Sequence, residues 1–167
     1  MSLKMNNKFK LTILVFLPFI IGFSIERLLT VGITGDNQLY LNLSSILLSL
    51  WIYGGGIVFW FCVGRMFGNL NMSTVKSFIL GNIAWGISFI LYTWQFKLVD
   101  DSSRNLFISA ISQHYPLGFV SLGSSIIGMF TRHLKGTTVI LIAYFLMLMV
   151  FSLGFISTVR SKIIKPN

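Results

Sequence analysis

Very few side chains in this sequence have the chemistry to bind a ligand or to carry a proton. Glu26 and Arg27 are the only adjacent opposite charges within a long apolar stretch, and His114 precedes a Tyr-Pro pair. An ionisable residue at membrane depth is by default a candidate functional residue, and a histidine titrates near neutral pH. Glu26 and His114 are therefore candidate ligand-binding residues. For Glu26 the simpler alternative is an ion pair with Arg27 or Arg104; for His114 it is a loop position at headgroup level.

A second group of candidates follows helical spacing between residues 75 and 96. One side of the predicted helix carries Ser77, Gly81, Trp85, Ser88, Tyr92 and Gln95, and the other carries Ile79, Ile83, Ile87, Ile90, Leu91 and Trp94. Because lipid offers no partner to polar groups, we expect the first side to face other helices and the second to face lipid. The last four residues of the first side are candidate ligand-binding residues, with ordinary packing as the alternative.

Three consecutive glycines, Gly54 to Gly56, interrupt another apolar stretch. Glycine exposes the backbone and lets a helix bend, so Gly55 is a candidate point where carbonyls meet a ligand, as in discontinuous transporter helices. The alternative is a close crossing with another helix. Ser45 and Ser49 align with Gly56 as a packing face, and the pair Gly64 and Gly68 has the small-xxx-small spacing of a helix contact, a weak indication of dimerisation.

The sequence contains none of the patterns that catalysis or metal binding requires. The only close carboxylate pair, Asp100 and Asp101, is adjacent in a loop, whereas proton-sharing carboxylates must face one another. The two histidines and the single cysteine, Cys62, lie on separate segments and do not supply a ligand set. No phosphate loop or nucleophile elbow is present. We therefore expect no enzyme activity, no metal site and no cofactor.

The elements that must position these candidates are membrane helices. Hydrophobic residues make up 54% of the 167 residues and charged residues 10%, where soluble domains carry about 25%. A chain of this composition would aggregate in water, which excludes a soluble enzyme and a disordered tail. The thirteen Lys and Arg residues lie in short groups between apolar runs. That distribution orients membrane spans and is not a nucleic-acid patch, so we expect a lipid bilayer and no nucleic acid as partner.

Five apolar stretches predict an all-α integral membrane bundle that forms a single domain over residues 1–167. The predicted spans are 11–33, 43–63, 75–96, 117–131 and 137–159. A crossing helix needs about 20 residues, and the fourth stretch is shorter. The alternative therefore has four spans, with a re-entrant or interfacial segment at 117–131.

Small residues favour a buried central helix for the fourth stretch. On an ideal helical wheel one narrow arc carries Gly118, Ser121, Ser125 and Gly128, an arrangement that lets neighbouring backbones approach closely. If the helix extends back past Pro116, His114 joins that arc. The preceding segment, 104–113, predicts an interfacial helix with Leu106, Phe107, Ile108 and Ile111 as its apolar side.

Positive charges predict the orientation of the spans. Lys4, Lys8 and Lys10 place the N-terminus in the cytoplasm of a multi-pass protein of the cell membrane. With five spans the basic C-terminal residues fall outside, against the positive-inside rule, and with four spans they fall inside. The N-terminal stretch also has features of a signal peptide, but apolar residues resume at Leu28, which favours a retained helix.

Two classes of function fit these expectations. The first is a non-enzymatic accessory or interaction subunit that packs against a partner membrane protein, or against a second copy, through its small-residue faces. The alternative is a small carrier or ligand-binding membrane protein, with a site toward the outer leaflet near Glu26. We favour the first, because a carrier needs a polar path through the midplane and the candidates there are uncharged.

Overall fold

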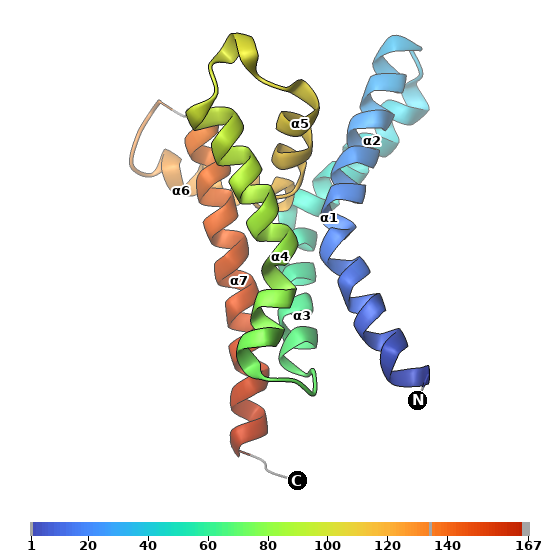
Figure 1. Cartoon of the computed structure of the whole chain (residues 1–167). Helices are drawn as coiled ribbons and strands as arrows, with labels where there is room; N and C mark the ends of the chain where they lie inside the picture. The colour runs from blue at the N-terminus through green and yellow to red at the C-terminus, as the bar shows by residue number, and fades with distance from the viewer. Residues whose placement is uncertain (1, 134, 165–167) are drawn as a thin grey trace.

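The computed structural model describes residues 2–133 and 135–164, and every regular element in that part is a helix. The α-helices are α1 (Ser2–Thr34), α2 (Gln38–Leu50), α3 (Gly56–Gly68), α4 (Thr74–Thr93), α5 (Leu106–His114), α6 (Val120–Gly128) and α7 (Gly136–Ile164). Short π-helical and 3-10 turns join or extend them: η1 (Trp51–Gly55), η2 (Trp94–Leu98), η3 (Asp101–Ser103) and η4 (Leu117–Phe119). The predicted all-α bundle is confirmed (Figure 1).

Three helices begin where a side chain caps the free backbone N–H groups of the first turn. Asn37 accepts from the N–H groups of Leu39 and Tyr40 at the start of α2. Ser73 accepts from the N–H of Lys76 at the start of α4, and Asn105 accepts from the N–H of Ile108 at the start of α5. These caps satisfy donors that would otherwise lack a partner, and they fix where each helix starts.

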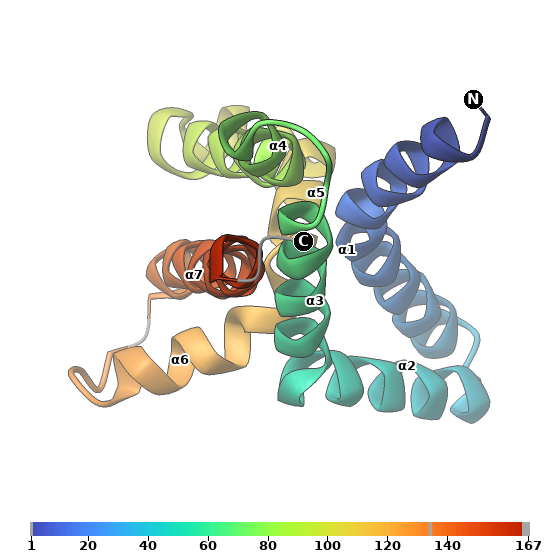
Figure 2. The ribbon, with the colours of Figure 1, turned by 90° about the horizontal axis from the view of Figure 1, so that it is seen from below.

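Four helical segments of the described chain are long and apolar enough to cross a membrane. They are Ile13–Thr34, Gln38–Gly68, Thr74–Leu98 and Gly136–Lys162. The helix Leu117–Gly128 is shorter than a bilayer requires. It begins at the tip of α5, which turns back toward the middle of the bundle, and α6 then runs beside α7 (Figures 1 and 2). The structure therefore favours the four-span alternative, in which 117–128 is an inserted segment shorter than a span.

The second span is broken in its middle by η1. Gly54 has φ +141°, a conformation that residues with a Cβ rarely adopt, and the backbone of Tyr53 also leaves the helical range. As a result α2 and α3 leave this point in different directions (Figure 2). The predicted bend is confirmed at Gly54. The predicted close crossing is confirmed at Gly56, where an added Cβ would lie 2.9 Å from the Cα of Gly118.

The tightest helix contact joins α3 and α7. A Cβ added at Gly64 would overlap the backbone carbonyl of Phe151, and one added at Gly154 would overlap that of Phe61. Gly68 lies against Phe155 in the same way. The predicted small-xxx-small contact is thus made within the chain, by α7. Around it lies a core of fully buried large side chains: Trp60, Phe67, Tyr92, Tyr115, Phe119, Tyr144, Met147 and Phe151.

The two predicted sides of α4 are confirmed. Ser77, Gly81, Ser88, Tyr92 and Gln95 are buried and Trp85 is half-buried. Ile79, Ile83, Ile87, Ile90 and Trp94 are exposed, and Leu91 is half-buried. The helix therefore presents branched aliphatics outward and polar groups inward, which is the arrangement that lipid favours.

The predicted packing arc on the fourth stretch is only partly correct. Gly118 is buried against Gly56, but Ser125 and Gly128 are exposed and Ser121 is half-buried. The residue of α6 that lies against α7 is instead Gly123, next to Val139 and Ala143, and Ile127, one turn later, is buried as well. The reason is the break at η4. Its 3-10 turn advances about 120° per residue, whereas an α-helix advances about 100°. One helical wheel therefore cannot describe both Gly118 and the residues of α6.

Candidate functional site

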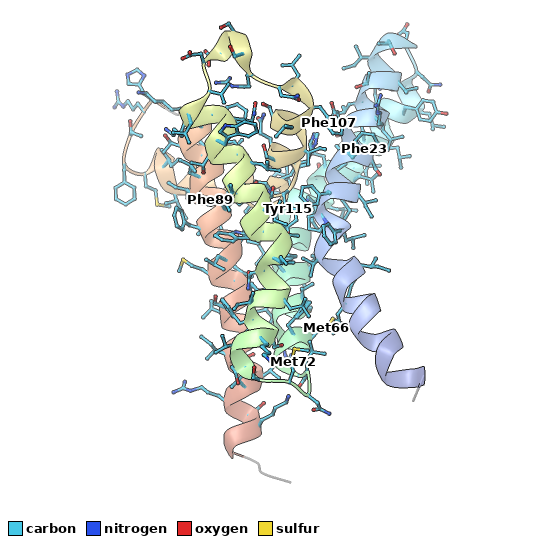
Figure 3. The ribbon with its side chains drawn as sticks, viewed as in Figure 1. Phe23, Met66, Met72, Phe89, Phe107 and Tyr115 are labelled. Carbon is cyan, nitrogen blue, oxygen red and sulfur yellow. The ribbon has the colours of Figure 1, made fainter. Side chains whose placement is uncertain are left out.

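The predicted interfacial helix α5 is turned with its serines inward. Ser109 and Ser112 are buried, whereas Leu106 and Phe107 are exposed. Figure 3 shows Tyr115, which follows this helix, within the bundle. The exposed Leu106 and Phe107 lie opposite the buried serines, so α5 turns a polar side toward the interior of the bundle, the reverse of a helix that lies on a water-facing surface.

A buried hydrogen-bond network joins α4, α5 and α7 through Tyr144. Its hydroxyl lies 2.6 Å from the hydroxyl of Ser88 and donates to the carbonyl oxygen of Ser112, also at 2.6 Å. The indole of Trp85 donates to the carbonyl of Tyr144 at 3.0 Å, and the hydroxyl of Tyr92 donates to the carbonyl of Thr137. Three of the predicted candidates on α4 therefore bind groups of α7.

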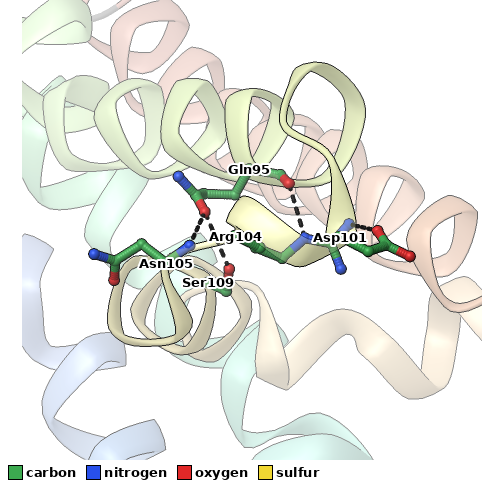
Figure 4. Close-up of polar contacts among 5 residues, drawn as sticks. All are labelled: Gln95, Asp101, Arg104, Asn105 and Ser109. Carbon is green, nitrogen blue, oxygen red and sulfur yellow. Dashed lines mark hydrogen bonds and ion pairs between the residues drawn. The ribbon is translucent and has the colours of Figure 1, made fainter.

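Gln95 ties the end of the third span to the loop before α5 (Figure 4). Its side-chain Oε1 accepts from the backbone N–H of Asn105 at 2.8 Å and, at 3.5 Å, from the hydroxyl of Ser109. The guanidinium of Arg104 donates to the carbonyl of Gln95, pairs with Asp101, and lies 4.4 Å from the ring centre of Phe96. These contacts hold the loop in place, and they engage Gln95 inside the chain.

The structure brings together two candidates that lie 88 positions apart, Glu26 and His114. Nε2 of His114 lies 3.5 Å from a carboxylate oxygen of Glu26, and their side chains are 17% and 48% exposed. Gly22 makes this approach possible, because a Cβ there would lie 2.6 Å from that of His114. The expected partners of Glu26 were wrong: Arg104 binds Gln95 and Asp101, while Arg27 lies over the ring of Phe23.

Burial lowers the pKa of His114 below its ordinary value of 6.5, and the nearby carboxylate of Glu26 opposes that change. The helix does not extend back past Pro116, because α5 ends at His114, so the condition for His114 to share an arc with Gly118 is not met. His114 faces α1, where it forms a polar contact between the first span and α5.

The ligand-binding candidates therefore fall into three places. Trp85, Ser88, Tyr92 and Gln95 belong to the network and loop contacts of α4, while Glu26 and His114 form a pair on the α1 side. Gly55 is exposed at the kink. Among the residues that the structure describes, no three His, Cys, Asp or Glu side chains form a group that could hold a metal ion.

Sequence reasoning missed Tyr144 and the two serines of α5. Tyr144 lies within the apolar stretch of the last span and follows no polar spacing there, although a hydroxyl in such a helix needs a partner. Ser109 and Ser112 are three residues apart, so they lie on one side of a helix. A search for polar groups inside the most apolar segments would have found all three.

A second polar face runs along α2 and is open. At 100° per residue Gln38, Asn42, Ser45 and Ser49 share one side, and we call them the α2 polar face. All four are exposed. Within the described residues, the side-chain hydrogen bond of this face is internal, from Gln38 to Asn42 at 3.0 Å. The adjacent apolar side of α2, which carries Leu43, Ile46 and Leu50, is exposed as well.

Comparisons of the chain with protein-family models, with curated proteins and with solved structures gave no match.

Proposed function

We propose that this protein is a non-enzymatic interaction subunit that binds a transmembrane helix of a partner membrane protein through the α2 polar face. The observation that carries the proposal is the exposure of four polar side chains on α2, within a segment that is long and apolar enough to span a membrane. Hydrocarbon offers no hydrogen bond to an amide or a hydroxyl, so such a face needs a protein partner.

The chemistry of the face defines the partner. Gln38 and Asn42 each carry a donor and an acceptor, and Ser45 and Ser49 carry hydroxyl groups. A complementary helix presents Ser, Thr, Asn or Gln at positions three and four apart. Interhelical hydrogen bonds in membranes each contribute about 0.6–2 kcal/mol, so a few of them suffice for specific association.

The filled interior argues against the alternative of a carrier. A substrate path through the bundle would pass between α3, α4 and α7. Large aromatic side chains with almost no exposed surface occupy that space, among them Trp60, Tyr92 and Phe151. The polar groups on α4 that would line such a path bind partners on α7 and α5.

For the orientation we propose a cell-membrane protein with both ends in the cytoplasm. The start of α1 and the end of α7 lie at the same end of the molecule (Figure 1). That end carries Arg65, Lys76, Arg160 and Lys162, and the sequence adds the lysines at the start of α1. With four crossings the C-terminal basic residues obey the positive-inside rule, which they violate with five.

Site-specific photo-cross-linking in native membranes tests the proposed contact. A photoreactive amino acid replaces Ser49 on the α2 polar face or, as the control on the adjacent apolar side, Leu50. The two positions lie on the same exposed helix about 100° apart, so they sample different faces. We expect a protein adduct from position 49, identified by mass spectrometry as a membrane protein, and lipid adducts from position 50.

Two outcomes would overturn the proposal. One is a set of lipid adducts alone from position 49, and the other is the same protein adducts from both positions. An adduct with twice the mass of the chain would show that the partner is a second copy of this protein. As a second readout, the photoreactive amino acid is placed at position 42. The double variant Ser45→Leu and Ser49→Leu should then lose the protein adduct from position 42 and keep the thermal stability of the wild type.

A further inference from the structure

A pocket of about 240 Å³ lies at the basic end of the bundle, away from the α2 polar face. It opens between the α3–α4 connection and the last turns of α7, near Met72, which Figure 3 shows at the lower end of the molecule. α3 ends at Gly68 and α4 begins at Thr74, so the pocket lies where two spans end. At this depth a bilayer places the phosphate groups of its lipids.

The wall of the pocket has one cationic and one apolar part. Lys162 is the charged residue of the lining, and its ammonium group donates to the carbonyl of Gly68 at 2.9 Å. An ammonium group has three donors, so two remain for an anion. Phe155 and Val159 supply the apolar part, which suits glycerol and the start of an acyl chain.

The charges around the pocket favour an anion. Arg65 in the last turns of α3, Lys76 in the first turn of α4 and Arg160 near the end of α7 are all exposed at this end. The four acidic residues of the chain lie on the upper part of α1 or in the connections at the opposite end: Glu26, Asp36, Asp100 and Asp101. An anionic headgroup therefore meets attraction here without a competing carboxylate.

We propose that this pocket binds the phosphate headgroup of an anionic phospholipid, with Lys162 as the principal contact. The headgroup phosphate accepts from the ammonium group, while the apolar part of the wall receives the glycerol end of the acyl chains. The volume of about 240 Å³ gives room for a headgroup and not for a whole lipid. The acyl chains then extend along α7 into the bilayer.

Thermal unfolding of the full chain in neutral detergent tests this site, with phosphatidylglycerol, phosphatidylcholine or inorganic phosphate added. We expect phosphatidylglycerol to raise the unfolding temperature of the wild type and the other two to have little effect. Lys162→Gln should weaken the apparent affinity about fivefold, the contribution of one basic residue near an anionic lipid. Lys162→Arg keeps the charge and should keep the binding.

Arg160→Gln is the matched control, because it removes a charge from the same end of α7 at a residue outside the lining. It should weaken binding by less than about twofold, since screened charges at a distance contribute little. If Lys162→Gln fails to fold without lipid, Met72→Trp narrows the pocket at a connection and leaves every charge in place. It should weaken binding as well.

Three results would overturn the proposal. Equal stabilisation by phosphatidylcholine would show that charge is not recognised. Unchanged affinity in both Lys162→Gln and Met72→Trp would place the lipid elsewhere. Equal stabilisation by inorganic phosphate would make the site a general anion site and not a lipid site.

Discussion

α2 and α4 both belong to membrane-spanning segments that carry a polar side, yet the chain uses the two polar sides in opposite ways. On α4 the polar side is buried, and Ser88, Tyr92 and Gln95 bind groups of α7, α5 and the loop before it. On α2 the polar side is exposed, and its hydrogen bond runs between two of its own residues, Gln38 and Asn42. Each helix therefore has the pattern of a packing helix, but the chain supplies a partner for one of them.

The difference shows that a polar pattern in a membrane helix indicates a contact but does not identify the molecule that makes it. Lipid imposes the same demand on both helices, because neither can leave amides and hydroxyls facing hydrocarbon without cost. α4 lies within the side of the molecule built from α3, α4 and α7. α2 lies with the second half of α1 at the edge, away from that core (Figures 1 and 2). Position in the bundle, more than sequence, decides the outcome.

The largest expected effect on stability comes from a substitution that forces α3 and α7 apart. In Gly64→Leu the side chain would meet the backbone of Phe151 on α7, so α3 and α7 must separate. We expect a loss of about 3 kcal/mol or more, or failure to fold. Thermal or denaturant unfolding in detergent measures it. The control is Gly86→Leu on α4, where an added Cβ meets nothing within 4 Å and stability should be kept.

The next effect concerns the kink that directs α2 to the edge. Gly54→Ala forces a residue with a Cβ into φ +141°, although the space around it is open. We expect a loss of about 2 kcal/mol from backbone strain alone. Gly86→Ala, in regular helix on α4, should instead be neutral or gain about 0.5–1 kcal/mol. Equal unfolding temperatures for the two variants would show that the kink is not strained.

Two substitutions compare the used and the unused polar side directly, each by the loss of one hydroxyl. Tyr144→Phe removes the group that joins Ser88 to the carbonyl of Ser112, and we expect a loss of about 1–1.5 kcal/mol. Ser49→Ala, on the α2 polar face, should leave the stability of the isolated protein unchanged. A similar loss in both variants would contradict the distinction between a used and an unused polar side.

The smallest effect is a pH dependence at the contact between α1 and α5. Because burial lowers the pKa of His114, the unfolded chain binds its proton more readily than the fold does. The free energy of unfolding should therefore fall as the pH drops below about 6.5. His114→Gln should flatten this decrease, and Glu26→Gln should steepen it, because Glu26 opposes the lowered pKa.

The faces of α4 were predictable because one regular helix keeps one period from Ser77 to Tyr92. The same reasoning failed across 114–128, where Pro116 and the 3-10 turn change the phase between Gly118 and α6. A wheel drawn through such a break places residues on sides they do not share. The change of backbone geometry after Pro116 therefore determines which residues of 117–128 are buried.

Contacts between distant segments were beyond the reach of periodicity. Nothing in the spacing of residues relates Glu26 to His114, or Tyr144 to Ser112, since helical pattern tells which side is polar and not which helix lies opposite. The same limit applies to α2. Its serines were expected to pack, but the sequence could not tell whether the chain itself would cover them.

Labelling of single cysteines from the two sides of the membrane tests the central claim most directly: four crossings that place α2 and α4 both at lipid depth. Cys62 is first replaced by Ser, and single cysteines are placed at Asn69, Ser102, Arg132 and Ser161. With four crossings, the cysteines at Asn69 and Ser161 should react from one side of the membrane, and those at Ser102 and Arg132 from the other. Reaction of Arg132 from the same side as Asn69 would show that 117–131 crosses the membrane, and would contradict the arrangement described above.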